Sequence, residues 1–114
     1  MDKIFEKTLL FDFYGELLTD RQKELYQLYQ LDDLSLGEIS EQLSISRQGV
    51  HDAIKRCNTQ LAHFEDKLQL VHRYIRNKHR AEQIYALAKI IQEEHSIAEV
   101  DEIKSITKEI ISDM

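Results

Sequence analysis

The chain has 114 residues, a formal net charge of -6 and a single cysteine, Cys57. That length suits one folded unit, so residues 1–114 are predicted to form a single domain. One cysteine excludes an intramolecular disulfide and a cysteine-based zinc site within one chain. No stretch approaches the roughly 20 apolar residues of a membrane span, and the charged N-terminus is unlike a signal peptide, so we expect a soluble cytoplasmic protein.

The composition favours an all-α fold. Proline is absent and there are only three glycines, whereas Leu, Ile, Glu, Gln and Lys abound. Apolar residues at helical spacing predict a first helix over residues 3–17. Two capping boxes then mark helix starts, Thr19 with Gln22 and Ser35 with Glu38.

The most regular feature follows Ser46. Apolar residues recur there at alternating spacings of four and three, which is a heptad seam and predicts one continuous helix of about eight turns. Its partner is either the later helices predicted over residues 81–95 and 96–111, the last with Ser96 as N-cap, or the same helix in a second chain. The seam comprises Val50, Ile54, Cys57, Leu61, Phe64, Leu68, Val71 and Ile75.

Residues 34–56, LSLGEISEQLSISRQGVHDAIKR, have the parts of a helix-turn-helix. A short helix over about residues 35–43 is followed by a turn containing Ile45 and by a second helix. Gly49 costs that helix about 1 kcal/mol relative to Ala, which predicts close approach of another backbone, either that of a nucleic acid or that of the first helix of the motif. Arg and Gln suit guanine and adenine, while Ser and Lys suit phosphates. The residues expected to face outward are Ser46, Arg47, Gln48, His51, Asp52 and Lys55. The alternative is an ordinary capped helical hairpin.

Charge is distributed unevenly along the chain. Residues 1–46 carry a net charge of -6, residues 47–80 of +5 and residues 81–114 of -5. A nucleic acid is expected to contact the basic segment, including Arg56, Arg73 and Arg76. The alternative is that neighbouring acidic helices neutralise the basic one, and cations at a predicted helix end near residue 80 would also suit the helix dipole.

No sequence pattern indicates catalysis or a bound cofactor. The chain lacks a Gly-rich phosphate loop, an HExxH motif and a nucleophile set beside a base, so it is predicted not to be an enzyme. The histidines lack neighbouring carboxylates at ligand spacing, so no metal site is expected. Cys57 lies on the heptad seam, where a buried and unreactive thiol is expected.

The segment from LTDRQ through LSLGEISEQLSISRQGVHDAIKR to KLQL resembles region four of sigma factors, and more closely the YlxM family of bacterial proteins. The resemblance implies a sigma-factor region-four-like helix-turn-helix, with a recognition helix that begins at Ser46 and exposes Arg47, Gln48, His51 and Lys55. Family members are regarded as regulators linked to the signal recognition particle pathway, because their genes neighbour those of its GTPases. Sigma factors end soon after this motif, whereas this chain adds C-terminal helices, which argues against recognition of a promoter element.

Two functions fit these observations. The first is a nucleic-acid-binding regulator, of DNA or of the small RNA of the signal recognition particle. The second is a protein adaptor for the GTPases of that particle, with the helix-turn-helix as scaffold. A homodimer is expected for either, because one motif offers few phosphate contacts. Residues 19–60 would form the helix-turn-helix core, and residues 61–114 a helical extension used for dimerisation.

Overall fold

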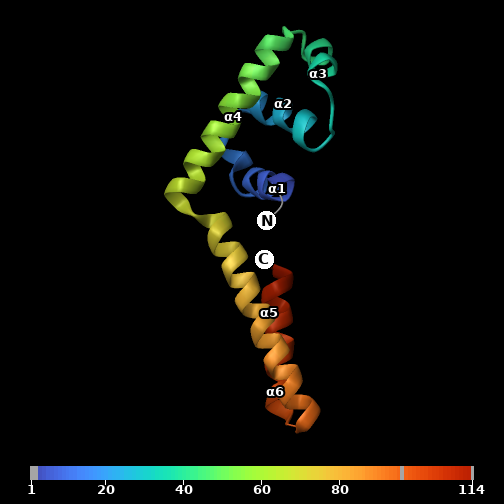
Figure 1. Ribbon diagram of the computed structural model, residues 1–114, viewed down its shortest axis with the longest axis vertical. Coiled ribbons are helices and arrows are strands. Elements are labelled where there is room, and N and C mark those ends of the chain that lie inside the picture. The colour runs from blue at the N-terminus through green and yellow to red at the C-terminus, as the bar shows by residue number, and fades with distance from the viewer. Residues whose placement is uncertain (1–2, 96, 114) are drawn as a thin grey trace. The chain divides into compact units, whose positions relative to one another are not determined.

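A computed structural model describes residues 3–95 and 97–113 of the chain (Figure 1). Within these residues every regular element is helical and no strand occurs, which confirms the all-α fold. The chain forms two compact units, Met1–Val71 and His72–Met114. Ser96, the predicted cap of the last helix, lies outside the described residues. The elements are α1 (Lys3–Tyr14), a 3-10 turn (Gly15–Leu17), α2 (Asp20–Gln30), α3 (Leu36–Leu43), α4 (Arg47–Leu68), α5 (Leu70–Glu94) and α6 (Ala98–Asp113).

Both predicted capping boxes are present in the first unit. The Thr19 hydroxyl accepts from the backbone N–H of Gln22 at 3.2 Å, and the Gln22 side chain accepts from the Thr19 N–H at 3.0 Å. Ser35 and Glu38 repeat the pair at 3.1 Å in both directions. These bonds satisfy N–H groups that have no partner inside the helix, so α2 and α3 begin where the sequence predicts.

The core of the first unit forms where α1, α2 and α3 pack on α4. The first four residues of the heptad seam, from Val50 to Leu61, are buried there. Val50 and Ile54 pack with Leu25 of α2 and Ile39 of α3, and each of these side chains contributes about 1.5–3 kcal/mol by leaving water. The seam therefore packs on the helices that precede it. The expected partners, the later helices or a second chain, were wrong for this half of the seam.

The continuous eight-turn helix was also wrong, because the chain breaks at Gln69. This residue has left-handed backbone angles, φ 53° and ψ 33°, and ends α4. The hydroxyl of Tyr14 accepts from the backbone N–H of Leu70 at 3.0 Å and donates to Glu65 Oε1 at 2.5 Å. Glu65 Oε1 also accepts from the N–H of Val71 at 3.0 Å. Two side chains thus cap the first N–H groups of α5 and hold the break in place.

The second unit is a hairpin in which α6 runs back alongside α5 (Figure 1). Lys104 of α6 donates to Gln92 of α5 at 2.7 Å, and Gln92 donates in turn to Asp101. The ammonium groups of Lys104 and Lys108 lie 5.5 and 5.4 Å from the centre of the Tyr85 ring. These contacts fix the register of the two antiparallel helices.

Helix α5 continues without interruption from Leu70 to Glu94. A separate helix over residues 81–95 was therefore a wrong prediction, and the basic run over residues 73–80 lies inside a helix. That run is far from the C-terminus of α5, so the helix dipole does not explain its charges.

Burial of Tyr26 makes the stability of the fold depend on pH in the alkaline range. Its hydroxyl donates to Asn58 Oδ1 at 2.7 Å, and its ring stacks on Phe11 with centroids 5.3 Å apart. Desolvation raises the pKa of Tyr26 from 10.0 to about 12. A phenol whose pKa is higher in the folded state contributes stability below pH 10 that is lost as the pH rises toward 12. We expect the free energy of unfolding, measured with denaturant, to fall over this interval, and to fall less steeply in Tyr26→Phe; equal slopes would contradict this assignment.

Candidate nucleic-acid interface

A tight turn joins α3 to α4 and sets the helix-turn-helix geometry. Helix α3 ends at Ser44, which has left-handed angles, φ 57° and ψ 43°. The Ser40 hydroxyl donates to the carbonyl of Ile45 and so ties the turn to α3. Ile39, with no exposed surface, fills the angle between the helices against Val50. The structure therefore contains the motif at the residues that the sequence predicts.

Ser46 begins α4 as its N-cap. Its Oγ accepts from the N–H of Gly49 at 2.9 Å. A Cβ on Gly49 would lie 3.1 Å from that same Oγ, so within the chain the close approach comes from the capping hydroxyl and not from the backbone of α3. Close approach of a nucleic acid at Gly49 stays a prediction. The Ser46 hydroxyl proton remains available to donate, and the first turn of α4 favours anions because its N–H groups and dipole point outward.

The six nucleic-acid-binding residues predicted between Ser46 and Arg56 are all exposed, and so is Asp52. Arg47 extends toward α3, because a Cβ on Gly37 would come within 3.1 Å of its guanidinium group. Glycine at position 37 thus leaves room for Arg47 to lie over the first turn of α3. The six residues are Ser46, Arg47, Gln48, His51, Lys55 and Arg56.

Asp52 occupies the middle of this surface and engages two of its neighbours. The Gln48 side chain donates to Asp52 Oδ1 at 3.0 Å, and His51 Nδ1 lies 3.6 Å from the same oxygen. In this arrangement one Gln48 donor is already used, so reading adenine through Gln48 requires that bond to open. A carboxylate at this position also repels nearby phosphates.

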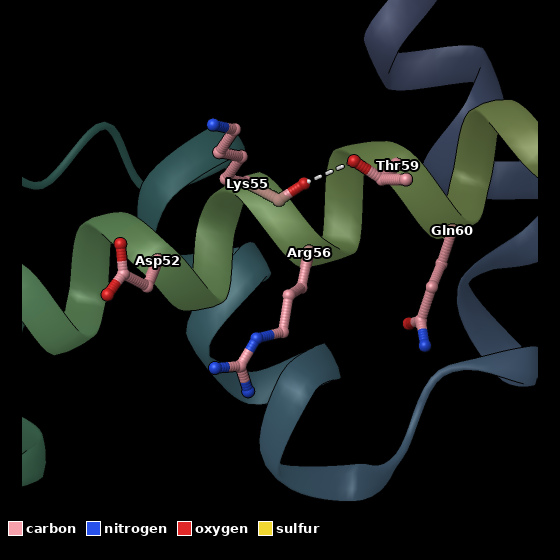
Figure 2. A pocket seen from close by; sticks show the side chains of 5 residues that line it. All are labelled: Asp52, Lys55, Arg56, Thr59 and Gln60. Atoms are coloured by element: carbon pink, nitrogen blue, oxygen red, sulfur yellow. Dashed lines mark hydrogen bonds between the residues drawn. The ribbon is translucent and has the colours of Figure 1, made fainter.

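Two hollows flank α4 beyond Asp52. The first has a volume of about 390 Å³ and is lined by Asp52, Lys55, Arg56, Thr59 and Gln60. Figure 2 shows that Lys55 and Arg56 leave α4 in different directions around it. The second, of about 370 Å³, is lined by Arg56 together with Arg21 and Gln22 from the start of α2. Arg56 is therefore shared by both hollows.

Arg21 is a basic residue that the sequence analysis did not select. It follows the Thr19 cap of α2, and the packing of α2 on α4 brings it to the hollow that Arg56 also lines. The sequence signal was the capping box, which places Arg21 in the first exposed turn of α2. Arg21 comes close to Arg56 only because α2 packs on α4, so the spacing of residues along the sequence could not reveal this pair.

Arg73 and Arg76 belong to the second unit. Both are exposed on α5, and neither lines the hollows beside α4. Further along the same helix, Lys78 lies 5.8 Å from the centre of the Tyr74 ring, a cation–π contact. The structure thus groups six of the eight predicted site residues on α4 and places the other two in a different unit.

The described residues offer no cluster of three His, Cys, Asp or Glu side chains that could hold a metal ion. Cys57 is fully buried, and burial raises the pKa of its thiol, which disfavours the reactive thiolate. None of the helices within residues 3–95 and 97–113 is both long and apolar enough to cross a membrane.

The turn between α3 and α4 and the exposed start of α4 define a helix-turn-helix protein. A family model described as "Putative helix-turn-helix protein, YlxM / p13 like" matches residues 1–95, and the chain belongs to this family, UPF0122.

Relatives from several bacteria cover most of the chain. A UPF0122 protein of Acetivibrio thermocellus is 56% identical over 84 residues, which is 74% of this chain and 72% of the relative. One from Thermoanaerobacter sp. (strain X514) is 46% identical over 110 residues, or 96% of this chain and 94% of the relative. A third, from Bacillus thuringiensis, is 41% identical over 110 residues and 96% of both chains.

Proposed function

We propose that this chain is a cytoplasmic, non-enzymatic regulatory protein that binds nucleic acid as a homodimer. The observation that supports the proposal is the exposed surface over the first three turns of α4, where Ser46 and Arg47 follow the turn of the helix-turn-helix and Lys55 and Arg56 lie further along the helix. Arg21 of α2 extends the same surface across the second hollow. Clustered cations of this kind attract phosphates locally, even though the whole chain has a net charge of -6.

Duplex DNA is the first candidate polymer. The major groove admits one α-helix, and α4 exposes long polar side chains over its first three turns for this purpose. The small RNA of the signal recognition particle is the second candidate, through the link implied by the YlxM resemblance. An RNA helix would be recognised by its shape and phosphates.

The carboxylate of Asp52 supports a second function. Asp52 lies among the cations of α4 and holds Gln48 in a hydrogen bond. A surface of mixed charge suits a protein partner, and the GTPases of the signal recognition particle are the partners that the family resemblance suggests. In that case the chain is an adaptor, and the cations of α4 matter little for its binding.

A salt titration of binding tests the proposal. Duplex DNA from upstream of the protein's own gene and the small RNA are titrated separately with wild type and with Arg47→Ala/Lys55→Ala. For the preferred polymer we expect the double variant to bind on the order of tenfold to a hundredfold more weakly, and the salt slope to fall by about two.

The matched control is Lys3→Ala/Lys7→Ala, which removes two positive charges from α1 and should bind as wild type does. No binding of wild type to either polymer at low salt would contradict the proposal. Binding to the GTPases that survives Arg47→Ala/Lys55→Ala would instead support the adaptor.

A further inference from the structure

The α5–α6 hairpin is closed by a seam of buried and half-buried residues. On α5 these are Ala81, Tyr85, Ala88 and Gln92, and on α6 they are Val100, Lys104, Thr107 and Ile111. The spacing on both helices is four, three and four, as expected for one face of a helix. Tyr85 contacts Lys104 and Lys108, so residue 85 of α5 lies level with about residue 106 of α6. Gln92 contacts Lys104 and Asp101, so residue 92 lies level with about residue 102.

A second set of aliphatic residues lies one position before each seam. A step of one residue turns the side chain by about 100°, and in antiparallel helices this step turns both sets toward the same broad side of the hairpin. We call this set the aliphatic face. In the register above its members form three level pairs: Ile84 with Ile110, Leu87 with Ile106, and Ile91 with Ile103.

The aliphatic face is open in the single chain. Its six side chains are between 44% and 62% exposed, and together they present on the order of 500 Å² of apolar surface, more than isolated surface residues account for. The residues one position after the seam lie on the opposite side of the hairpin and are mostly charged. The charged ones are Glu82, Lys89, Glu93, Asp101 and Lys108, and the others are Ala86, Ser105 and Ser112. The hairpin therefore has one charged side that is well solvated and one apolar side that would be more stable if it were buried against a partner.

We propose that the same face of a second copy covers it, so that two hairpins form a four-helix bundle. Paired six-residue faces with their rims approach the roughly 800 Å² per partner of a standard interface. The corners of the face are also complementary to themselves. A two-fold axis that lays α5 on α5 brings Arg80 opposite Glu94 of the other copy, and one that lays α5 on α6 brings it opposite Asp113.

The aliphatic face is thus the interface of the homodimer that the proposed function includes. This inference rests on the dimerisation in that proposal and does not depend on nucleic-acid binding. Such a bundle gives each dimer two copies of the α4 surface. Doubling the phosphate contacts in this way raises affinity for nucleic acid without any change in α4.

The test is the mass of the full-length chain by light scattering and sedimentation equilibrium at micromolar concentration. Wild type should have twice the monomer mass of 13.5 kDa. Leu87→Glu/Ile106→Glu should weaken dimerisation at least a hundredfold, because like charges would face each other across the bundle. The matched control is Ile90→Glu, since Ile90 is 54% exposed on α5 but lies off the face, and it should remain dimeric.

A crosslinking measurement keeps the inference testable if the double glutamate variant unfolds. Leu87→Cys, alone or with Ile106→Cys, should form a disulfide-linked dimer under mild oxidation, whereas Glu93→Cys on the charged side should not. A monomeric wild type, or a dimer unchanged by Leu87→Glu/Ile106→Glu, would overturn the inference. If a monomeric chain binds nucleic acid, the dimer interface is wrong and the nucleic-acid-binding function stands. If the chain is a dimer through this face but binds neither polymer, the interface stands and the nucleic-acid-binding function is wrong.

Discussion

Replacing Ser46 by Asp is expected to abolish most nucleic-acid binding while leaving the fold as stable as before. Asp caps a helix as well as Ser does, and its charge suits the positive end of the α4 dipole. The same charge would face the phosphates that Ser46 is proposed to meet, and opposed like charges at an interface cost several kcal/mol. We therefore expect binding to weaken about a hundredfold, measured by titration at fixed salt alongside denaturant unfolding.

Two further substitutions at Ser46 separate charge from capping. Ser46→Asn keeps a capping oxygen without charge, so both binding and stability should stay near wild type. Ser46→Ala removes the acceptor for the Gly49 N–H and should cost about 1 kcal/mol of stability. If Ser46→Asp and Ser46→Asn bind equally well, nucleic acid does not contact the start of α4.

Tyr14→Phe is expected to give the largest loss of stability among conservative changes. The Tyr14 ring has no exposed surface, and its hydroxyl joins Glu65 to the N–H of Leu70. Phe fills the same space but removes the acceptor of the Leu70 N–H and one donor to the Glu65 carboxylate. Both groups are only partly buried, so water replaces part of what is lost and the cost is about 1 kcal/mol for each. Denaturant unfolding should show a lower midpoint with an unchanged slope.

The partner residue gives a graded series for the same junction. Glu65→Gln keeps an oxygen that can accept from the Val71 N–H, whereas Glu65→Ala keeps none. The alanine variant should therefore be less stable than the glutamine variant. Burial raises the pKa of the Tyr14 hydroxyl, and the hydrogen bond to Glu65 raises it further. Equal stability of Tyr14→Phe and wild type would show that the junction is held by packing alone.

The helix starts of the first unit could be predicted from sequence because their causes are local. Thr19 with Gln22 and Ser35 with Glu38 satisfy their own backbone groups within three residues, and the structure contains both pairs. The break at Gln69 has only part of its cause nearby, in the Glu65 carboxylate that accepts from the Val71 N–H. The heptad spacing continues across it, and the groups that cap α5 come partly from Tyr14, which lies 56 residues away. A pattern of spacing cannot detect a hydroxyl on a distant helix.

The candidate site was predictable in part for the same reason. Exposure of Arg47, Gln48 and Lys55 follows from helical periodicity once the start of α4 is known. The bond between Gln48 and Asp52 and the position of Arg21 beside Arg56 depend on side-chain conformation and on how α2 packs. Whether Arg73 and Arg76 act together with the residues of α4 stays a prediction.

The capped junction after Gln69 gives α1 control over a joint formed much later in the chain. Leu68 and Leu70 on either side of Gln69 are good helix formers, so helix propensity alone does not end the helix there. Without the Tyr14 hydroxyl, the Leu70 N–H at the start of α5 loses its acceptor. A side chain of the first helix thus takes part in ending α4, so a substitution in α1 is felt at a helix end far along the chain.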